Sequence, residues 1–227
     1  MTINVYWACL EEEWMRAEEP APVLSQFIKQ HSNEKSLISC PAVKNALTNH
    51  YSIKSLYDYE FFVSDNSASS QMYTQEFFDT HITIRNLEER LFSFSQQFIF
   101  FTDEPSLLMT GNLMPYLEKN NVTKTCIPVP GLYDIGKWFR QIEFAFFMPK
   151  DVDTFKISQG EVFQYIHFHT DKKINLIQFT PSNHLMRILN DVHKSRNYKK
   201  FMPYLDYFYK TFKLKPQLLR EIKENIL

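Results

Sequence analysis

The stretch Pro130–His169 constrains the fold of this chain most, because it alternates strand-like runs with turns. Two of its runs, Gln141–Met148 and Glu161–His169, are rich in aromatic and β-branched residues, and a polar loop separates them. Gly131 precedes the first run and Gly160 the second, at the positions where the chain has to reverse. This pattern is typical of the core of a β-barrel or a related β architecture.

The rest of the chain predicts an α+β fold that is mainly β. We expect a barrel-like or jelly-roll-like body over residues 1–180 and a C-terminal helical segment, residues 181–227, packed on it. Proline suits the first turn of a helix, so two short helices are expected from Pro22 to Gln30 and from Pro41 to Asn49. The other strands are predicted at 3–9, 51–63, 81–85, 90–101, 106–109 and 175–179, and the C-terminal helices after Thr180, at 200–212 and at 216–226.

The composition indicates a folded protein with unusually many rings. Aromatic residues make up 16% of the chain, with 21 Phe and 12 Tyr, which is enough to fill a sizeable core. Leftover rings could line a groove or a subunit contact, so we expect a protein partner or self-association. The formal net charge of −1 provides no overall field that would attract nucleic acid or an acidic membrane.

The sequence lacks the residues that several functional classes of protein require. The 3 cysteines are far apart and form no CxxC pair, and the 4 glycines build no phosphate-binding loop. No apolar stretch is long enough for a transmembrane helix, and Glu11, Glu12 and Glu13 argue against a signal peptide. We expect a cytoplasmic protein with reduced thiols and no membrane contact.

His167 and His169 alternate on one predicted strand, so their imidazoles would point to the same face. Such a pair forms half of many iron or zinc sites, which a carboxylate and often another histidine complete. Glu161 shares the parity of His167, but no third ligand can be placed. The alternative is two histidines on a solvent-exposed face, or hydrogen-bonded at the rim of a barrel.

Asp134 is the second candidate for chemistry, at the end of the predicted turn Pro130–Asp134. A carboxylate that a rigid turn positions could activate a water molecule. It could equally close the turn by accepting hydrogen bonds from backbone N–H groups, which is a common use of aspartate.

The C-terminal region is basic, with nine lysines and arginines from Lys194 onwards against three acidic residues. Tyr198, Tyr204, Tyr207 and Tyr209 are interleaved with them. Basic and aromatic side chains together could bind a phosphate backbone and stack on bases. The alternative is a solvated helical face whose tyrosines pack on the β body.

Pro130–His169 resembles the C-terminal half of the dUTPase and dCTP deaminase β-clip family. The shared residues are Pro130, Gly131, Leu132 and Asp134, and then Phe155, Ile157, Gly160 and Glu161. The resemblance implies a β-clip-like fold, a trimer, and nucleotide binding or hydrolysis with Asp134 as the catalytic carboxylate. Of that family's upstream phosphate motif, only Gly111 is present.

The whole chain is also similar to proteins without an assigned activity from marine T-even-like tailed bacteriophages. The stretches that carry this similarity are CPAVKNALTNHYSIKSLYDYEF, LFSFSQQFIFFTDEPSLLMT and PGLYDIGKWFR. The similarity implies a phage origin, and hence the cytoplasm of a host cell.

Three functions remain open from the sequence. The first is a non-enzymatic binding or assembly protein. The second is a nucleotide-binding or nucleotide-hydrolysing protein that uses Asp134, and the third is a jelly-roll metal-dependent enzyme that uses His167 and His169. The sequence favours the first, because the motif positions of the β-clip family are degenerate.

Overall fold

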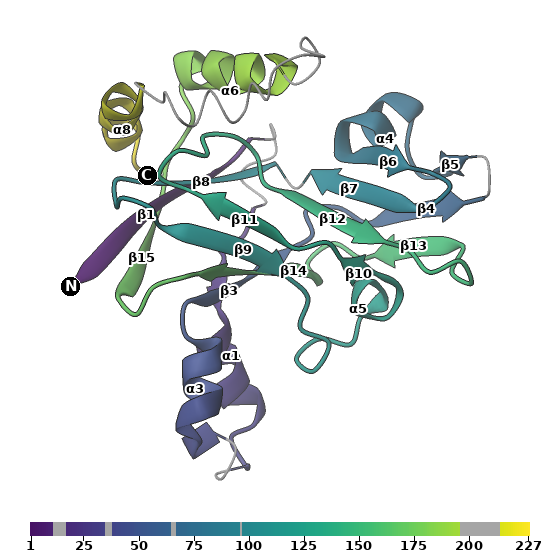
Figure 1. Cartoon of the computed structure of the whole chain (residues 1–227), viewed down its shortest axis with the longest axis horizontal. Coiled ribbons are helices and arrows are strands. Elements are labelled where there is room, and N and C mark those ends of the chain that lie inside the picture. Colours follow the sequence, from purple (N-terminus) through teal and green to yellow (C-terminus); the bar gives the residue numbers. More distant parts are fainter. Residues whose placement is uncertain (11–16, 35–37, 65–66, 96, 196–213) are drawn as a thin grey trace.

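The computed structural model describes residues 1–10, 17–34, 38–64, 67–95, 97–195 and 214–227, with only the backbone given for 191–195. Its strands form four sheets, and helices lie at the periphery (Figure 1). The prediction of a mainly β fold with a helical C-terminal segment is confirmed. Within the described residues, the four sheets are open and none closes into a barrel.

The first sheet brings the N-terminal strand beside a strand from the last third of the chain. The order is β15 (Lys173–Gln178), β1 (Thr2–Cys9) and β8 (Phe98–Thr102). The central strand, β1, pairs in parallel with β15, where Thr2 lies opposite Lys173. On its other side β1 pairs antiparallel with β8, where Tyr6 lies opposite Phe101.

The second sheet has five strands and faces the first across an apolar core. Val5 and Trp7 of β1 and Phe100 of β8 meet Ile53 and Phe168 in this core. All neighbouring strands of the sheet are antiparallel. Their order is β11 (Gly131–Asp134), β9 (Leu108–Asn112), β14 (Val162–Phe168), β3 (His50–Lys54) and β2 (Ala21–Pro22).

The third and fourth sheets enclose a second core made largely of phenylalanine rings. Phe61 stacks on Phe155 with ring centroids 4.7 Å apart, and both lie in one cluster with Phe92 and Phe94. The third sheet is β10 (Ile127–Pro128), β12 (Glu143–Phe147), β7 (Leu91–Ser95) and β6 (Ile82–Asn86). The fourth is β13 (Thr154–Ile157), β4 (Tyr59–Val63) and β5 (Ala68–Ser69).

The apolar run predicted as strand over 90–101 forms two strands in different sheets. β7 belongs to the third sheet and β8 to the first, and Gln97 between them has φ 57°, a left-handed backbone that interrupts a strand. Every residue of β8 is buried, as expected for a strand covered on both faces. The alternation in 91–95 gives way to an all-apolar stretch in β8 because β7 fills one core, whereas β8 lies between two others.

Strand β14 contributes to three cores because its register shifts. The pairing with β3 is irregular between Val162 and Gln164, and Phe163 at that bulge packs in the phenylalanine core. Further along the strand, Ile166 enters the core under β1, while Tyr165 packs against the N-terminal helices.

The C-terminal helices cover the outer face of the first sheet (Figure 1). Helix α6 (Asn183–Ser195) contributes Leu185 and Leu189, and helix α8 (Lys215–Glu224) contributes Leu218 and Ile222. These side chains pack on Tyr6, Ala8, Ile99 and Phe101. The described helices of 181–227 therefore share a core with the β body. The helix predicted at 200–212 lies outside the described residues.

Two short helices project from the other side of the molecule in Figure 1. They are α1 (Val23–Gln30) and α3 (Pro41–Leu47), and Pro22 and Pro41 lie at their starts as predicted. Two more helices, which the sequence did not indicate to us, are α4 (Gln75–His81) and α5 (Asn121–Thr125). Their caps could have revealed them, because Thr74 and Asn120 each accept a hydrogen bond from the backbone N–H three residues on.

No helix in the described part of the chain has both the length and the apolar character needed to cross a membrane.

Candidate functional site

Asp134 ends strand β11 and closes the turn that follows it. Its Oδ1 accepts a hydrogen bond from the Gly136 N–H at 3.1 Å, and its Oδ2 lies 2.8 Å from Lys137 Nζ. Its backbone carbonyl accepts from the N–H groups of Lys137 and Trp138. The turn therefore lies at 134–137, because 131–134 pairs with β9 as a strand. Both carboxylate oxygens of Asp134 are engaged in holding this turn.

The surroundings of Asp134 are tightly packed. A Cβ added at Gly136 would come within 3.0 Å of the Glu104 carbonyl and 3.1 Å of Lys215 Nζ. Burial lowers the pKa of Lys215, and the negative charge of Asp134 opposes that shift. The charge of Asp134 thus acts on the start of α8, although the ion pair of Asp134 is with Lys137.

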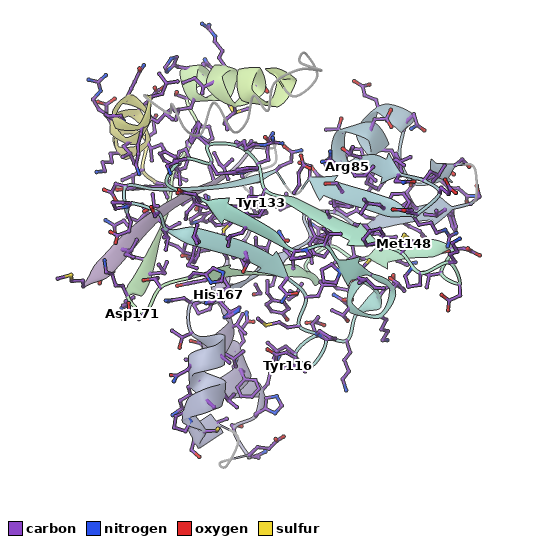
Figure 2. All side chains as sticks on the ribbon, viewed as in Figure 1. Arg85, Tyr116, Tyr133, Met148, His167 and Asp171 are labelled. Atoms are coloured by element: carbon purple, nitrogen blue, oxygen red, sulfur yellow. The ribbon has the colours of Figure 1, made fainter. Side chains whose placement is uncertain are left out.

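His167 and His169 share a face of the second sheet, and the structure adds His50 to them. His167 lies opposite His50 in the register of β14 and β3, and their rings stack with centroids 3.9 Å apart and planes 4° apart. The rings of His167 and His169 are 4.4 Å apart. Figure 2 shows His167 at the sheet surface above the projecting helices.

The three rings form a row in the order His50, His167, His169, which we call the histidine row. Its two outer members each have a polar partner. His169 Nε2 lies 3.1 Å from Thr110 Oγ1, and His50 Nδ1 lies 3.2 Å from the Thr48 carbonyl. Burial lowers the pKa of His50, and burial together with the two neighbouring imidazoles lowers the pKa of His167 to about 4. His50 and His167 are therefore neutral at neutral pH.

This arrangement is poorly suited to a shared metal ion. A ring nitrogen donates its lone pair in the plane of the ring, so two parallel rings cannot both direct lone pairs at one ion. Among the described residues, no group of three or more His, Cys, Asp or Glu side chains is placed to hold a metal. Glu161 precedes β14, and its carboxylate accepts a hydrogen bond from the Ser158 N–H. The bulge after it removes the parity with His167. The metal site stays a prediction.

An apolar hollow, which the sequence did not reveal to us, lies between the projecting helices and the loop that follows β9. It has a volume of about 380 Å³. We call it the α1–α3 hollow. Its lining residues are Phe27 and His31 of α1 and its end, Val43, Ala46 and Leu47 of α3, and Tyr116 of the loop.

The α1–α3 hollow has a firm base. Phe27 and Leu47, which line it, are buried in a cluster with Val23, Met114 and Tyr165. Tyr116 stands at the rim with 62% of its surface exposed, and Figure 2 shows it beside the upper part of the two helices. The hint in the sequence was the apolar spacing at Val43, Ala46 and Leu47, which share one helical face.

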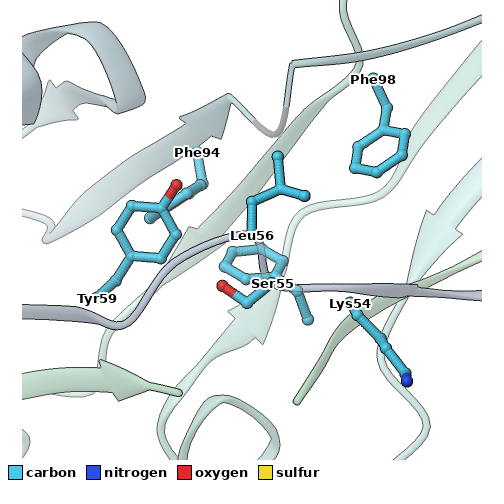
Figure 3. Close-up of a pocket in the computed structure, with 7 residues that line it drawn as sticks. Lys54, Ser55, Leu56, Tyr59, Phe94 and Phe98 are labelled. Carbon is cyan, nitrogen blue, oxygen red and sulfur yellow. The ribbon is translucent and has the colours of Figure 1, made fainter. Parts of the chain in front are cut away.

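A second void is far smaller. It has a volume of about 10 Å³, room for one water molecule, at the junction of the sheets. Figure 3 shows Leu56 between Tyr59 and Phe94 on one side and Phe98 on the other, with the Lys54 ammonium pointing away. This void is a packing defect of the core and has no space for a ligand.

Part of the basic C-terminal segment lies in the described residues. Lys215 Nζ lies 6.0 Å from the ring centroid of Phe101, and Lys223 Nζ lies 6.0 Å from that of Tyr6. Lys223 also pairs with Asp103 at 3.4 Å. These two lysines face the β body. The interleaved tyrosines Tyr198, Tyr204, Tyr207 and Tyr209 lie outside the described residues, so nucleic-acid binding stays a prediction.

Comparison with known proteins found no match for this chain. No model of a protein family matches it. No curated protein and no solved structure matches it either. The similarities to phage proteins and to the β-clip family, stated above from the sequence, therefore stay predictions.

Proposed function

We propose that this protein is a non-enzymatic binding or assembly protein, and that it holds an apolar side chain of a protein partner in the α1–α3 hollow. The observation that carries this proposal is the hollow itself. At about 380 Å³, it lies in the size range of pockets that bind ligands, whereas the void beside Leu56 has room for one water molecule.

The character of the hollow supports a binding role over a catalytic one. Its lining is aliphatic and aromatic, with His31 as its one ionisable imidazole. His31 Nδ1 already contacts Glu34 Oε1 at 3.2 Å. Tyr116 at the rim offers a large ring with a polar tip, which is the kind of side chain that dominates protein interfaces. Nothing in this lining has the nucleophile–base geometry that catalysis requires.

The proposal is tested by peptide display on the immobilised full-length protein. Sequences enriched on wild type are measured again on Ala46→Trp, in which an indole fills the hollow from an exposed position of α3. Asn45→Trp is the control, because it adds the same side chain to the same helix away from the lining. We expect enriched peptides to lose binding to Ala46→Trp and keep it with Asn45→Trp. Equal binding to both variants would refute the proposal.

The nucleotide-hydrolysing alternative has one observation in its favour. Lys137 and Lys215 place two ammonium groups around Asp134, and ammonium groups of this kind can pair with phosphate. Native mass spectrometry of the purified protein would detect a retained nucleotide. Under this alternative, Asp134→Asn abolishes nucleoside triphosphate hydrolysis, so unchanged hydrolysis in that variant would eliminate it.

A further inference from the structure

We propose that the partner segment presents its apolar side chain next to a lysine or arginine, and that this cation lies beside Glu118 when the apolar side chain fills the α1–α3 hollow. The inference rests on the proposed function and adds the charge of the partner to it. It follows from the position of Glu118, from the absence of a hydrogen bond or ion pair of its carboxylate with any described residue, and from the nearby carboxylate of Glu161.

The turn that carries Tyr116, a lining residue of the hollow, also fixes the backbone of Glu118. The N–H groups of Leu117 and Glu118 both donate to the Met114 carbonyl, at 2.9 and 3.1 Å. Met114 is buried in the cluster with Phe27 and Leu47, which line the hollow, and Leu117 packs against that cluster. The turn is therefore anchored at the base of the hollow, and Glu118 follows Tyr116, at the rim of the hollow, by two residues.

The carboxylate of Glu118 has no hydrogen bond or ion pair with any residue that the structure describes. Only its backbone is used, since the Thr123 hydroxyl donates to its carbonyl oxygen at 2.9 Å. The side chain is nevertheless half-buried. Burial, and then the negative charge of Glu161, raise the pKa of Glu118. An incoming cation stabilises a carboxylate in this state, because its positive charge offsets both effects.

The negative charge of Glu118 also reaches the base of the hollow. Burial raises the pKa of Tyr165 most, and the charge of Glu118 adds to that shift. Tyr165 packs in the cluster that forms the base. Like Glu118, the lysines Lys29, Lys44 and Lys119 do not line the hollow, but all three are exposed to solvent whereas Glu118 is half-buried. The local charge therefore complements a cationic segment, although the whole chain is nearly neutral.

The inference is tested with three blocked tetrapeptides that share a Leu-Phe centre and differ in the flanking residues, which are both Lys, both Gln or both Glu. Placing the charge on both sides removes the need to know the direction of binding. Affinities for the full-length protein are measured by NMR titration at low salt. On wild type, we expect the Lys-flanked peptide to bind at least about threefold tighter than the Glu-flanked one, in the order Lys, Gln, Glu.

Three variants separate the two proposals. Glu118→Gln should reduce the preference for the Lys-flanked peptide towards parity and leave binding of the Gln-flanked peptide unchanged. Glu224→Gln alters an exposed residue of α8 and the net charge by the same amount, and should keep the preference. Ala46→Trp should abolish binding of all three peptides.

The outcomes that overturn each proposal differ. If the three peptides bind wild type equally, or if Glu118→Gln keeps the full preference, the cationic partner is refuted while the hollow stands. If no peptide binds, or if Ala46→Trp binds as wild type does, the hollow as a binding site is refuted, and the cationic partner with it.

Discussion

At the scale of single residues, Asp134 and Arg90 both hold segments of the β body together. Asp134 closes a turn, as the alternative interpretation of that residue had it. Arg90, which the sequence did not single out, makes several hydrogen bonds with its guanidinium. Its guanidinium donates to the carbonyls of Val63, Pro149, Lys150 and Val152 and pairs with Asp153, and its backbone has φ 53°.

Replacing Arg90 should be strongly destabilising. Arg90→Ala leaves the carbonyl oxygens of Val63 and of residues 149, 150 and 152 without this donor, and should lower the free energy of unfolding by about 2–4 kcal/mol. Arg187→Ala, at an exposed position of α6, should change it by less than about 0.5 kcal/mol. Urea denaturation monitored by circular dichroism measures both. Similar effects of the two variants would contradict the role given to Arg90.

The histidine row predicts that stability depends on pH. The pKa of His167 is lowered to about 4 in the fold, so the unfolded chain binds its proton first as pH falls. The contribution of neutral His167 to the free energy of unfolding is fully present above about pH 6.5 and is lost progressively as the pH falls towards 4. Wild type should therefore lose stability relative to His167→Gln between pH 7 and pH 5. A difference between the two that stays constant in urea titrations over this range would show that His167 is not responsible.

At the scale of elements, the two C-terminal helices are joined by one carboxylate. Glu221 on α8 accepts hydrogen bonds from the hydroxyl of Ser182, ahead of α6, and from His184 Nδ1, the latter at 2.7 Å. The Ser182 oxygen also accepts from the Leu185 N–H and so caps α6. Burial acts to raise the pKa of Glu221, but these hydrogen bonds outweigh it, and the pKa is lowered.

Neutralising Glu221 should loosen α8 before the rest of the protein. Glu221→Gln should cost about 0.5–1.5 kcal/mol at pH 7 and speed amide hydrogen exchange in α8. Because the pKa of Glu221 is lower in the folded protein, its contribution to the free energy of unfolding is present above about pH 4.5 and is lost as the pH falls below that value. Glu224→Gln on the same helix is the control and should leave exchange unchanged. Equal exchange in both variants would argue against the Glu221 contact.

At the scale of the whole molecule, separate cores meet at shared strands. Side chains of β1 alternate between the core under the second sheet, through Val5 and Trp7, and the core under α6 and α8, through Tyr6 and Ala8. Residues at the very end of the chain add to this assembly, since the Leu227 N–H donates to the Gln178 carbonyl and Phe179 bridges to Ile226. Loss of packing on one face of β1 should therefore affect the whole fold.

Leu218→Ala tests this coupling. Leu218 is fully buried against the first sheet, and its truncation should lower the free energy of unfolding by about 2–4 kcal/mol in one cooperative transition. Gln217→Ala, on the exposed face of α8, should cost less than about 0.5 kcal/mol. Fluorescence and circular dichroism should give coincident transitions. An early transition confined to α8 would show that the helix folds independently of the β body.

By itself, the sequence determined the local elements and the mainly β class. The strands at 3–9, 141–148 and 161–169 and the helices that follow Pro22 and Pro41 could be predicted within a few residues, because periodicity and proline geometry act between near neighbours. Only the tertiary structure decided that 90–101 serves two sheets, that β1 pairs with β15, and that His50 stacks on His167. The same holds for the α1–α3 hollow, whose lining comes from three separate segments. Such contacts depend on pairing between segments far apart in the chain, which leaves no trace in the order of neighbouring residues.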